Sequence, residues 1–367
     1  MKSCYIHIPF CNTICTYCDF CKMYYNKKWI NKYLNELEKE IKSNYKDERL
    51  TTLYIGGGTP TCLNEEELEK LLKILTILKL DTEYEYTIES NVETLSLKKI
   101  KILKKYGVNR ISIGVQSIVD KNIEFLGRKH NKELVRNKIE ALKGNGINNI
   151  NIDLMYALPV ESIDDLKEDL DFFLSLDIPH ISTYSLIIEP HTILYINNLE
   201  NIDQETDFKM YEYICKTLKE NGYKHYEISN FSKPSYESKH NLTYWNNLEY
   251  YGFGLGASGY TNNVRYDNTR NIHEYLNGKQ VKENINVDIN MKIENEFILG
   301  LRKLEGINKK DFYNKYNLDI ENIEIINKLL KENKLIENGE NIFINPKYIY
   351  TSNLILMDFL GGNYEQN

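Results

Sequence analysis

The stretch CNTICTYC at residues 11–18 decides the fold of this 367-residue chain. It spells C-x3-C-x2-C and places the thiols of Cys11, Cys15 and Cys18 on one short loop. Three thiolates at this spacing suit an iron-sulfur cluster, because they can hold four irons and leave one iron open to a small molecule. The motif therefore predicts a metal cluster with a free coordination position.

Structural zinc is the alternative that the spacing alone leaves open, with Cys4 or Cys21 as the fourth ligand. Five of the seven cysteines lie within the first 21 residues, which argues against random scatter. A disulfide framework does not fit a long chain with an odd number of cysteines and no apolar export signal. We therefore expect a reduced protein in the cytoplasm.

Strand-loop-helix units extend from this motif through residue 221. The predicted strands cover 5–8, 50–55, 84–89, 110–115, 150–155 and 179–187. The predicted helices cover 28–43, 64–75, 96–106, 131–144, 162–176 and 205–221. Asn64 and Ser162 are suitable N-caps, because acidic side chains follow them in the first turn. Six units in succession predict a parallel sheet wrapped by helices.

Polar residues gather at the ends of these predicted strands. They are Cys11 to Cys18, Gly56 to Thr59, Glu89, Gln116 and Asp153. An open doubly wound sheet and a curved barrel both build their sites at the carboxyl ends of parallel strands. The pattern therefore predicts a single site at this end, but periodicity does not decide between the two architectures.

Residues 222–289 form a connecting region that is rich in Tyr, Asn and Gly. It contains two conspicuous strings, HNLTYW at 240–245 and GFGLGASG at 252–259. The glycine string lacks the strand-helix context and the following acidic residue of a dinucleotide fingerprint. It therefore predicts a tight turn that packs against the site.

Residues 290–367 predict a small helical C-terminal domain. Helices are expected at 292–302, 308–316 and 321–334, followed by a hairpin around Asn338-Gly339. This order is winged-helix-like, a shape that binds DNA in some proteins. The segment carries ten Lys and Arg against twelve Asp and Glu, and the whole chain has a net charge of −7. Because phosphate neutralisation supplies most of such affinity, we expect no nucleic-acid partner.

Further strings around the cysteine motif point to a family: YIHIPF at 5–10, Asp19-Phe20, and GGGTP at 56–60. With the cysteines they resemble the radical S-adenosylmethionine (SAM) superfamily, and more narrowly its anaerobic coproporphyrinogen III oxidase group. The resemblance spans almost the whole chain. It implies an α/β fold, with a partial (β/α)6 radical SAM barrel over 1–221, a heme-handling region over 222–289 and the winged-helix-like domain.

The resemblance also implies the site residues. Cys11, Cys15 and Cys18 would bind a 4Fe-4S cluster, whose fourth iron SAM would chelate; Cys21 is not assigned to the cluster. The other cofactor-binding positions would be Tyr5, Tyr17, Gly57, Gly58, Thr59, Glu89, Gln116, Arg128 and Asp153. Glycines let the backbone approach a ligand, carboxylates accept bonds from hydroxyl or ammonium groups, and arginine pairs with a carboxylate. For the strand-end side chains, a role in holding their own loops is the alternative.

Two branches of this group differ in function. One oxidatively decarboxylates coproporphyrinogen III without oxygen, and the other, the HemW heme chaperones, delivers heme to acceptor proteins. The first branch carries a segment ahead of its cysteines and a further cysteine two residues after the third ligand, where this chain has Phe20. His240 in HNLTYW resembles the proposed heme ligand of the second branch, although a surface or hydrogen-bonded histidine is the alternative.

We therefore expect a heme chaperone that holds a 4Fe-4S cluster, SAM and heme. Its partners would be heme-accepting apoproteins, among them membrane-associated respiratory proteins. The alternative is an oxygen-independent coproporphyrinogen III oxidase that cleaves SAM. A radical enzyme that acts on nucleic acid through the C-terminal domain is the third hypothesis, and salt-dependent binding of DNA or RNA would support it.

Overall fold

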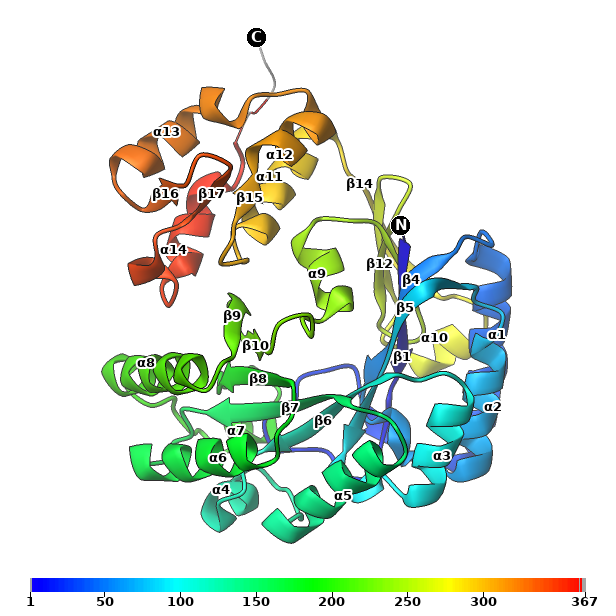
Figure 1. Ribbon diagram of the computed structural model, residues 1–367. Helices are drawn as coiled ribbons and strands as arrows, with labels where there is room; N and C mark the ends of the chain where they lie inside the picture. The colour runs from blue at the N-terminus through cyan, green and yellow to red at the C-terminus, as the bar shows by residue number, and fades with distance from the viewer. Residues whose placement is uncertain (1, 363, 365–367) are drawn as a thin grey trace.

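The computed structural model describes residues 2–362 and residue 364. Its centre is a curved sheet in which six parallel strands follow one another in chain order (Figure 1). These strands are β1 (Lys2–Ile8), β4 (Leu50–Gly57), β5 (Leu80–Asn91), β6 (Arg110–Gln116), β7 (Asn149–Tyr156) and β8 (His180–Ser185). A doubly wound sheet would reverse its order at a switch point, and this sheet does not. The chain therefore forms a partial (β/α)6 barrel, as the resemblance implied.

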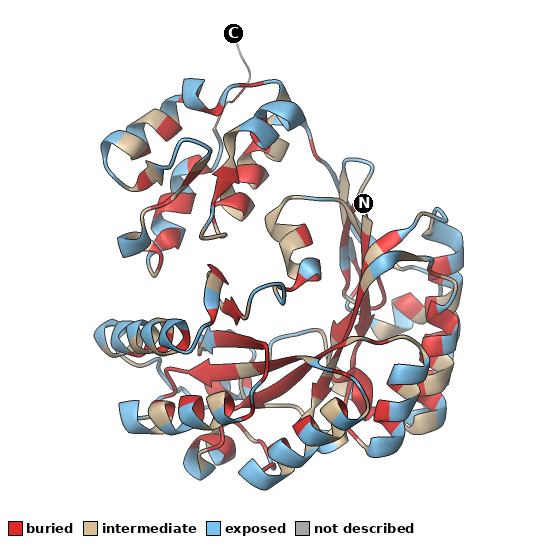
Figure 2. Cartoon of the chain, viewed as in Figure 1, coloured by how far each residue is buried: buried red, intermediate tan, exposed pale blue. Residues whose placement is uncertain are grey.

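Helices cover the outer face of this sheet, and Figure 2 shows buried residues on the strands and on the helix faces turned toward them. They are α1 (Lys27–Asn44), α2 (Glu65–Leu75), α3 (Leu97–Lys105), α5 (Lys132–Gly144), α6 (Ile163–Ser175) and α8 (Gln204–Glu220). Two short helices, α4 (Asp120–Phe125) and α7 (Ile193–Ile196), were not expected from the sequence. They are too short to show a helical period of apolar residues.

The two predicted N-caps are both present, as parts of capping boxes. Asn64 accepts a hydrogen bond from the Glu67 amide at 2.9 Å, and the Glu67 carboxylate accepts one from the Asn64 amide at 3.0 Å. Ser162 and Asp165 make the same reciprocal pair at the start of α6. Each box satisfies two backbone donors that have no partner within the helix.

Residues 224–286 extend the same sheet at both of its edges. On one side, β10 (Asn230–Ser232) pairs antiparallel with β8, and β9 (Lys224–Glu227) pairs with β10. On the other side lie β11 (Tyr250–Phe253), β12 (Ser258–Thr261), β13 (Val264–Asn268) and β14 (Val281–Asn286), with β11 parallel to β1. Helix α9 (Lys239–Trp245) lies on the path between the two edges and contacts β4; α10 (Ile272–Leu276) packs against α1 (Figure 1). The sheet is therefore continuous across the boundary predicted at residue 222.

The glycine-rich string forms the tight turn between β11 and β12. Gly254 has φ +104°, and a Cβ there would lie 2.5 Å from the carbonyl oxygen of His7. The buried carboxylate of Glu40 on α1 holds this turn, since it accepts hydrogen bonds from the Gly254 amide at 2.9 Å, Asn268 Nδ2 at 2.7 Å and the Tyr275 hydroxyl at 2.6 Å. One side chain thus ties the outer helix to the added strands.

The C-terminal domain has the predicted winged-helix-like order and its own hydrophobic core. Its helices are α11 (Ile289–Gly300), α12 (Lys309–Tyr316), α13 (Glu324–Lys331) and α14 (Ser352–Leu356). Its sheet has the order β15 (Ile307–Asn308), β17 (Asn341–Ile344), β16 (Leu335–Glu337). Gly339 turns the hairpin with φ +93°. No helix within the described residues is long and apolar enough to cross a membrane.

We predict that Glu40→Ala destabilises the protein by about 2–4 kcal/mol, because three buried donors lose their common acceptor. Chemical denaturation followed by far-UV circular dichroism measures the loss. Glu38→Ala on the same helix is the control; its carboxylate makes only a surface ion pair with Lys42, so a change below about 0.5 kcal/mol is expected. Equal effects of the two substitutions would show that the Glu40 cluster does not hold the turn.

Candidate functional site

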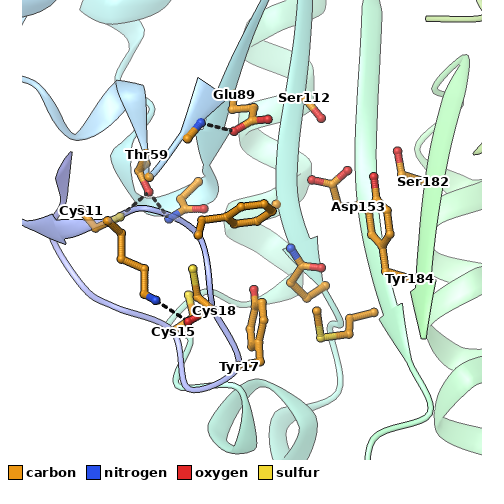
Figure 3. A pocket seen from close by; sticks show the side chains of 18 of the residues that line it. Cys11, Cys15, Tyr17, Cys18, Thr59, Glu89, Ser112, Asp153, Ser182 and Tyr184 are labelled. Atoms are coloured by element: carbon orange, nitrogen blue, oxygen red, sulfur yellow. Dashed lines mark hydrogen bonds between the residues drawn. The ribbon is translucent and has the colours of Figure 1, made fainter. Parts of the chain in front are cut away.

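A cavity of about 340 Å³ lies at the carboxyl ends of the parallel strands. It brings together eleven of the thirteen residues predicted for the site: Cys11, Cys15, Tyr17, Cys18, Gly57, Gly58, Thr59, Glu89, Gln116, Arg128 and Asp153. Figure 3 shows the three cysteines on one side of this cavity and Asp153 and Tyr184 on strands across from them. Tyr5 and His240 do not line it.

The cysteine loop is fixed at both of its ends. β2 (Phe10–Cys11) pairs with β3 (Met23–Tyr24), so the chain leaves and rejoins the barrel at one place. Hydrogen-bond donors reach two of the sulfurs, since Thr59 Oγ1 lies 3.6 Å from Cys11 Sγ and Arg128 Nη1 lies 3.6 Å from Cys15 Sγ. Such donors stabilise negative charge on sulfur.

The chemistry of these cysteines fits a bound cluster. Burial raises the pKa of the Cys11 thiol to about 11, and burial also raises the pKa of Cys18. The Cys11 and Cys18 thiols are therefore protonated at neutral pH in the free protein, and the positive charge of bound iron would deprotonate them. Among the described residues, no three His, Cys, Asp or Glu side chains form a preformed site for one metal ion.

The remaining two cysteines of the N-terminal group lie elsewhere. Cys4 is fully buried on β1, within the hydrophobic core. Cys21 lines a second, smaller cavity, and a Cβ on Gly256 would come within 2.8 Å of its sulfur. Neither sulfur lines the cavity that holds Cys11, Cys15 and Cys18.

The glycine run allows the strand end to meet the cysteine loop. A Cβ on Gly58 would lie 2.8 Å from Cys11 Sγ and equally close to the carbonyl oxygen of Phe10. Gly57 has φ +116°, and its amide donates to Glu89 at 3.0 Å. A larger residue at Gly58 would displace the cysteine loop, and one at Gly57 would clash with the imidazole of His7, 2.7 Å from the Cβ position.

Glu89 and Asp153 are two carboxyl groups that the cavity wall largely shields from water. Burial raises the pKa of Glu89 to about 7, although Tyr54 and the Gly57 amide both donate to it. Burial likewise raises the pKa of Asp153 to about 6. Near neutral pH, the Glu89 carboxyl group is therefore partly ionised. A small change in its surroundings decides whether it is a charged acceptor for a hydroxyl or ammonium group of a ligand.

Gln116 gives independent support for a ligand in this cavity. Its side-chain oxygen Oε1 is buried and has no hydrogen-bond partner among the described residues, and its backbone has φ +73°. Strained backbone and unpaired buried acceptors are costly and recur where a ligand supplies the missing partner. Arg128, by contrast, is already held by Asn91 at 3.0 Å and by the Gly114 carbonyl oxygen at 2.5 Å.

The interior of the barrel adds lining residues that the sequence analysis missed: Arg110, Ser112, Asn151, Ser182 and Tyr184. Asn151 lies two residues before Asp153 on β7, and therefore on the same face of the strand as the predicted residue. Period-two alternation on the strands was the signal that could have found them. Arg110 is 2% exposed, and its Nε has no partner among the residues described.

Tyr5 and His240 both pack against Tyr54, a residue that lines the large cavity. The Tyr5 hydroxyl bonds to His7 Nδ1 at 3.0 Å, and Tyr5 lines the second cavity of about 200 Å³. His240 is 1% exposed, and both ring nitrogens are hydrogen-bonded, to Thr52 and Tyr244. The structure thus shows His240 as a buried, hydrogen-bonded residue with no free lone pair for a metal.

Comparisons with known proteins agree with this geometry. The model of the radical SAM superfamily matches residues 5–173. The heme chaperone HemW of Lactococcus lactis is 42% identical over 98% of this chain and 97% of its own length, and that of Bacillus subtilis is 40% identical over 98% and 100%. Among solved structures, Escherichia coli coproporphyrinogen III oxidase (HemN), a radical SAM enzyme, superposes with a TM-score of 0.86 at 20% identity, over 98% of this chain and 90% of its own.

We predict that Cys18→Ser abolishes stable cluster assembly while Cys21→Ser leaves it intact, because only Cys18 lines the cavity with the other two motif cysteines. Iron and sulfide content and visible absorbance after anaerobic reconstitution measure the cluster. A loss of iron in Cys21→Ser equal to that in Cys18→Ser would assign Cys21 to the cluster.

Glu89 should make the cluster-free protein less stable as the pH rises. An acid whose pKa is raised on folding binds more protons in the folded state, so stability falls between the unfolded pKa of 4.5 and the folded pKa of about 7. The free energy of unfolding of the wild type should therefore fall between pH 5 and pH 8. We predict that this fall is smaller by roughly 2 kcal/mol in Glu89→Gln. Urea unfolding at both pH values tests this, and identical losses in the two proteins would contradict it.

Proposed function

We propose that this chain, which belongs to the HemW family of the radical SAM superfamily, is a heme chaperone that binds heme and transfers it to acceptor hemoproteins. The observation that carries the proposal is similarity to HemW proteins along nearly the full length of both chains. Family membership also gives the chain a 4Fe-4S cluster and SAM.

The large cavity has the groups that these two cofactors need. We assign the cluster to Cys11, Cys15 and Cys18. We assign SAM to Gly57, Gly58, Thr59, Glu89, Gln116, Arg128 and Asp153, with Tyr17 beside the cluster and Tyr5 in the adjoining wall. The cluster, when bound, would supply two things: an iron that coordinates SAM, and an electron for SAM.

The positions of these side chains allow specific contacts with the two cofactors. Glu89 in its ionised form accepts hydrogen bonds from a hydroxyl or ammonium group, and the unpaired Gln116 oxygen accepts another. Arg128 donates from Nη2 to the Gly114 carbonyl oxygen and from Nη1 to both Asn91 and the Cys15 sulfur, so it places positive charge beside the cluster. Burial around these groups excludes water from the bound cofactor.

Oxygen-independent coproporphyrinogen III oxidase activity is less well supported. The similarity to the E. coli enzyme at 20% identity concerns the fold alone. At residue 20, where that branch is expected to carry a cysteine, this chain has a phenylalanine that is 65% exposed. Action on nucleic acid is disfavoured by the acidic excess of the C-terminal domain.

His240 is the heme ligand in this proposal. Since both its nitrogens are hydrogen-bonded, iron must replace one of these partners. For the acceptors, we propose that they include membrane-associated respiratory proteins, and that the protein works in the reducing cytoplasm, where its seven free cysteines stay reduced.

We predict that anaerobically reconstituted protein binds heme with a saturable Soret band, and that His240→Ala weakens this binding at least 10-fold. His273→Ala, on the exposed side of α10, is the control and should bind as the wild type does. Absence of saturable heme binding in the wild type would remove the proposed function, and conversion of coproporphyrinogen III would then be assayed. Transfer of the bound heme to apomyoglobin tests the second half of the proposal.

A further inference from the structure

Three tyrosine rings enclose His240. Its imidazole stacks on Tyr54 with ring centroids 4.9 Å apart and an interplanar angle of 26°, and it meets Tyr244 edge-on at 5.1 Å and 85°. Tyr5 lies further away at 6.5 Å. No room for a porphyrin exists directly beside the ring in this conformation, since the residue is 1% exposed.

The two ring nitrogens have different surroundings. Nδ1 lies 2.7 Å from Oγ1 of Thr52, a residue of β4 that is itself 1% exposed. Nε2 lies 2.8 Å from the hydroxyl of Tyr244, and Tyr244 lines the second cavity. Only the Nε2 side can therefore be opened to a cavity by the movement of a single side chain.

The tautomer that leaves Nε2 free to coordinate iron is the one in which Nδ1 carries the proton, and Thr52 Oγ1 lies where it can accept that hydrogen bond. Burial lowers the pKa of His240 to about 3, so the ring is neutral, with one donor and one acceptor nitrogen. When Nδ1–H donates to Thr52, the Nε2 lone pair accepts from the Tyr244 hydroxyl. A ligand histidine in proteins usually has its second nitrogen donating to an oxygen in this way.

The first turn of α9 is held by hydrogen bonds at His240, whereas the side chain of Tyr244 makes a single hydrogen bond and packs edge-on against Tyr250 at 4.7 Å. The Glu85 carboxylate accepts from the amides of Lys239 and His240 at 3.1 and 3.0 Å, and so fixes the first turn. Tyr244 lies one turn later, next to the end of the helix at Trp245. Its hydroxyl has no other partner within residues 2–362 and residue 364.

The second cavity is lined by side chains that can bind one edge of a porphyrin. Phe20, Tyr244 and Tyr250 give it flat apolar walls, and Arg270 gives it a cation. Arg270 is exposed and makes no ion pair or side-chain hydrogen bond with any part of the chain that the structure describes. Aromatic rings pack against porphyrin faces, and a guanidinium pairs with a carboxylate such as a heme propionate.

We propose that Tyr244 is a cover over the iron-binding nitrogen of His240. Heme enters the second cavity, the Tyr244 hydroxyl gives up its hydrogen bond to Nε2 and turns to water, and Nε2 coordinates iron while Arg270 pairs with a propionate. A coordinate bond replaces a hydrogen bond, the tyrosine keeps its proton, and no electron is transferred. This inference rests on the proposed function. It adds that Nε2 of His240 is the coordinating atom, that heme binds in the second cavity, and that the Tyr244 hydroxyl competes with iron.

The test is Tyr244→Phe, which keeps the ring and deletes the competing hydroxyl. Because an intramolecular hydrogen bond no longer opposes binding, heme affinity should rise about 2- to 10-fold over the wild type, with the same Soret position. Tyr195→Phe deletes a tyrosine hydroxyl outside both cavities and should leave affinity unchanged. Thermal melts and cluster content show that both variants are folded.

Two further variants test the remaining parts. Thr52→Val should weaken heme binding, because the Nδ1 proton loses its acceptor in the tautomer that leaves Nε2 free for iron. Arg270→Gln should weaken the binding of heme but not that of heme dimethyl ester, which lacks free carboxylates.

The outcomes are distinguishable. If the wild type binds no heme, the proposed function and this inference both fail. If the wild type binds but folded Tyr244→Phe binds no more tightly, the cover is refuted and the proposed function stands. If Cys21→Ser, rather than His240→Ala, removes a thiolate-type spectrum, then the ligand is Cys21 and the inference is overturned.

Discussion

The close approach of two backbone segments at Gly58 is the constraint on which the rest of the large cavity depends. The Gly58 amide donates to the Ile8 carbonyl at 2.9 Å and the Thr59 amide to Phe10 at 2.8 Å, so the glycine run continues the pairing of β4 with β1 past the strand end. With no side chain between them, the cysteine loop lies directly against the strand that also positions Glu89. These backbone hydrogen bonds fix the Cys11 end of the loop against the glycine run.

Local sequence signals predicted the parts of the fold that local interactions determine. The helix starts at Asn64 and Ser162 are examples, because capping is settled within four residues. The choice between barrel and open sheet was not predictable from periodicity, since it depends on which strands pair over long separations. The same holds for β11, whose partner residues on β1 lie 247 positions earlier in the chain. Strand-end polar residues were informative because parallel strands bring their ends together whatever the curvature.

His240 shows the limit of a motif. The string HNLTYW names the residue types but says nothing of their surroundings, and the structure places the imidazole in a buried tyrosine box with both nitrogens bonded. Tyr54 in that box has a second contact, since its hydroxyl donates to Glu89 at 2.8 Å. A single side chain therefore touches both the wall of the large cavity and the ring of His240. A change of charge on Glu89 acts on a residue that also packs against the histidine.

The order of strands in the sheet has a consequence for how the chain folds as it is made. The outer edge of β1 is covered by β11, and the outer edge of β8 by β10, so both edges of the six-stranded barrel stay unpaired until residues 230–253 have been synthesised. Open strand edges are templates for pairing with other chains, and contacts of long sequence separation form slowly. The strand that carries the chain into its cysteine loop is thus exposed until those residues are made, and a nascent chain that ends before residue 230 lacks both edge strands and is prone to aggregate.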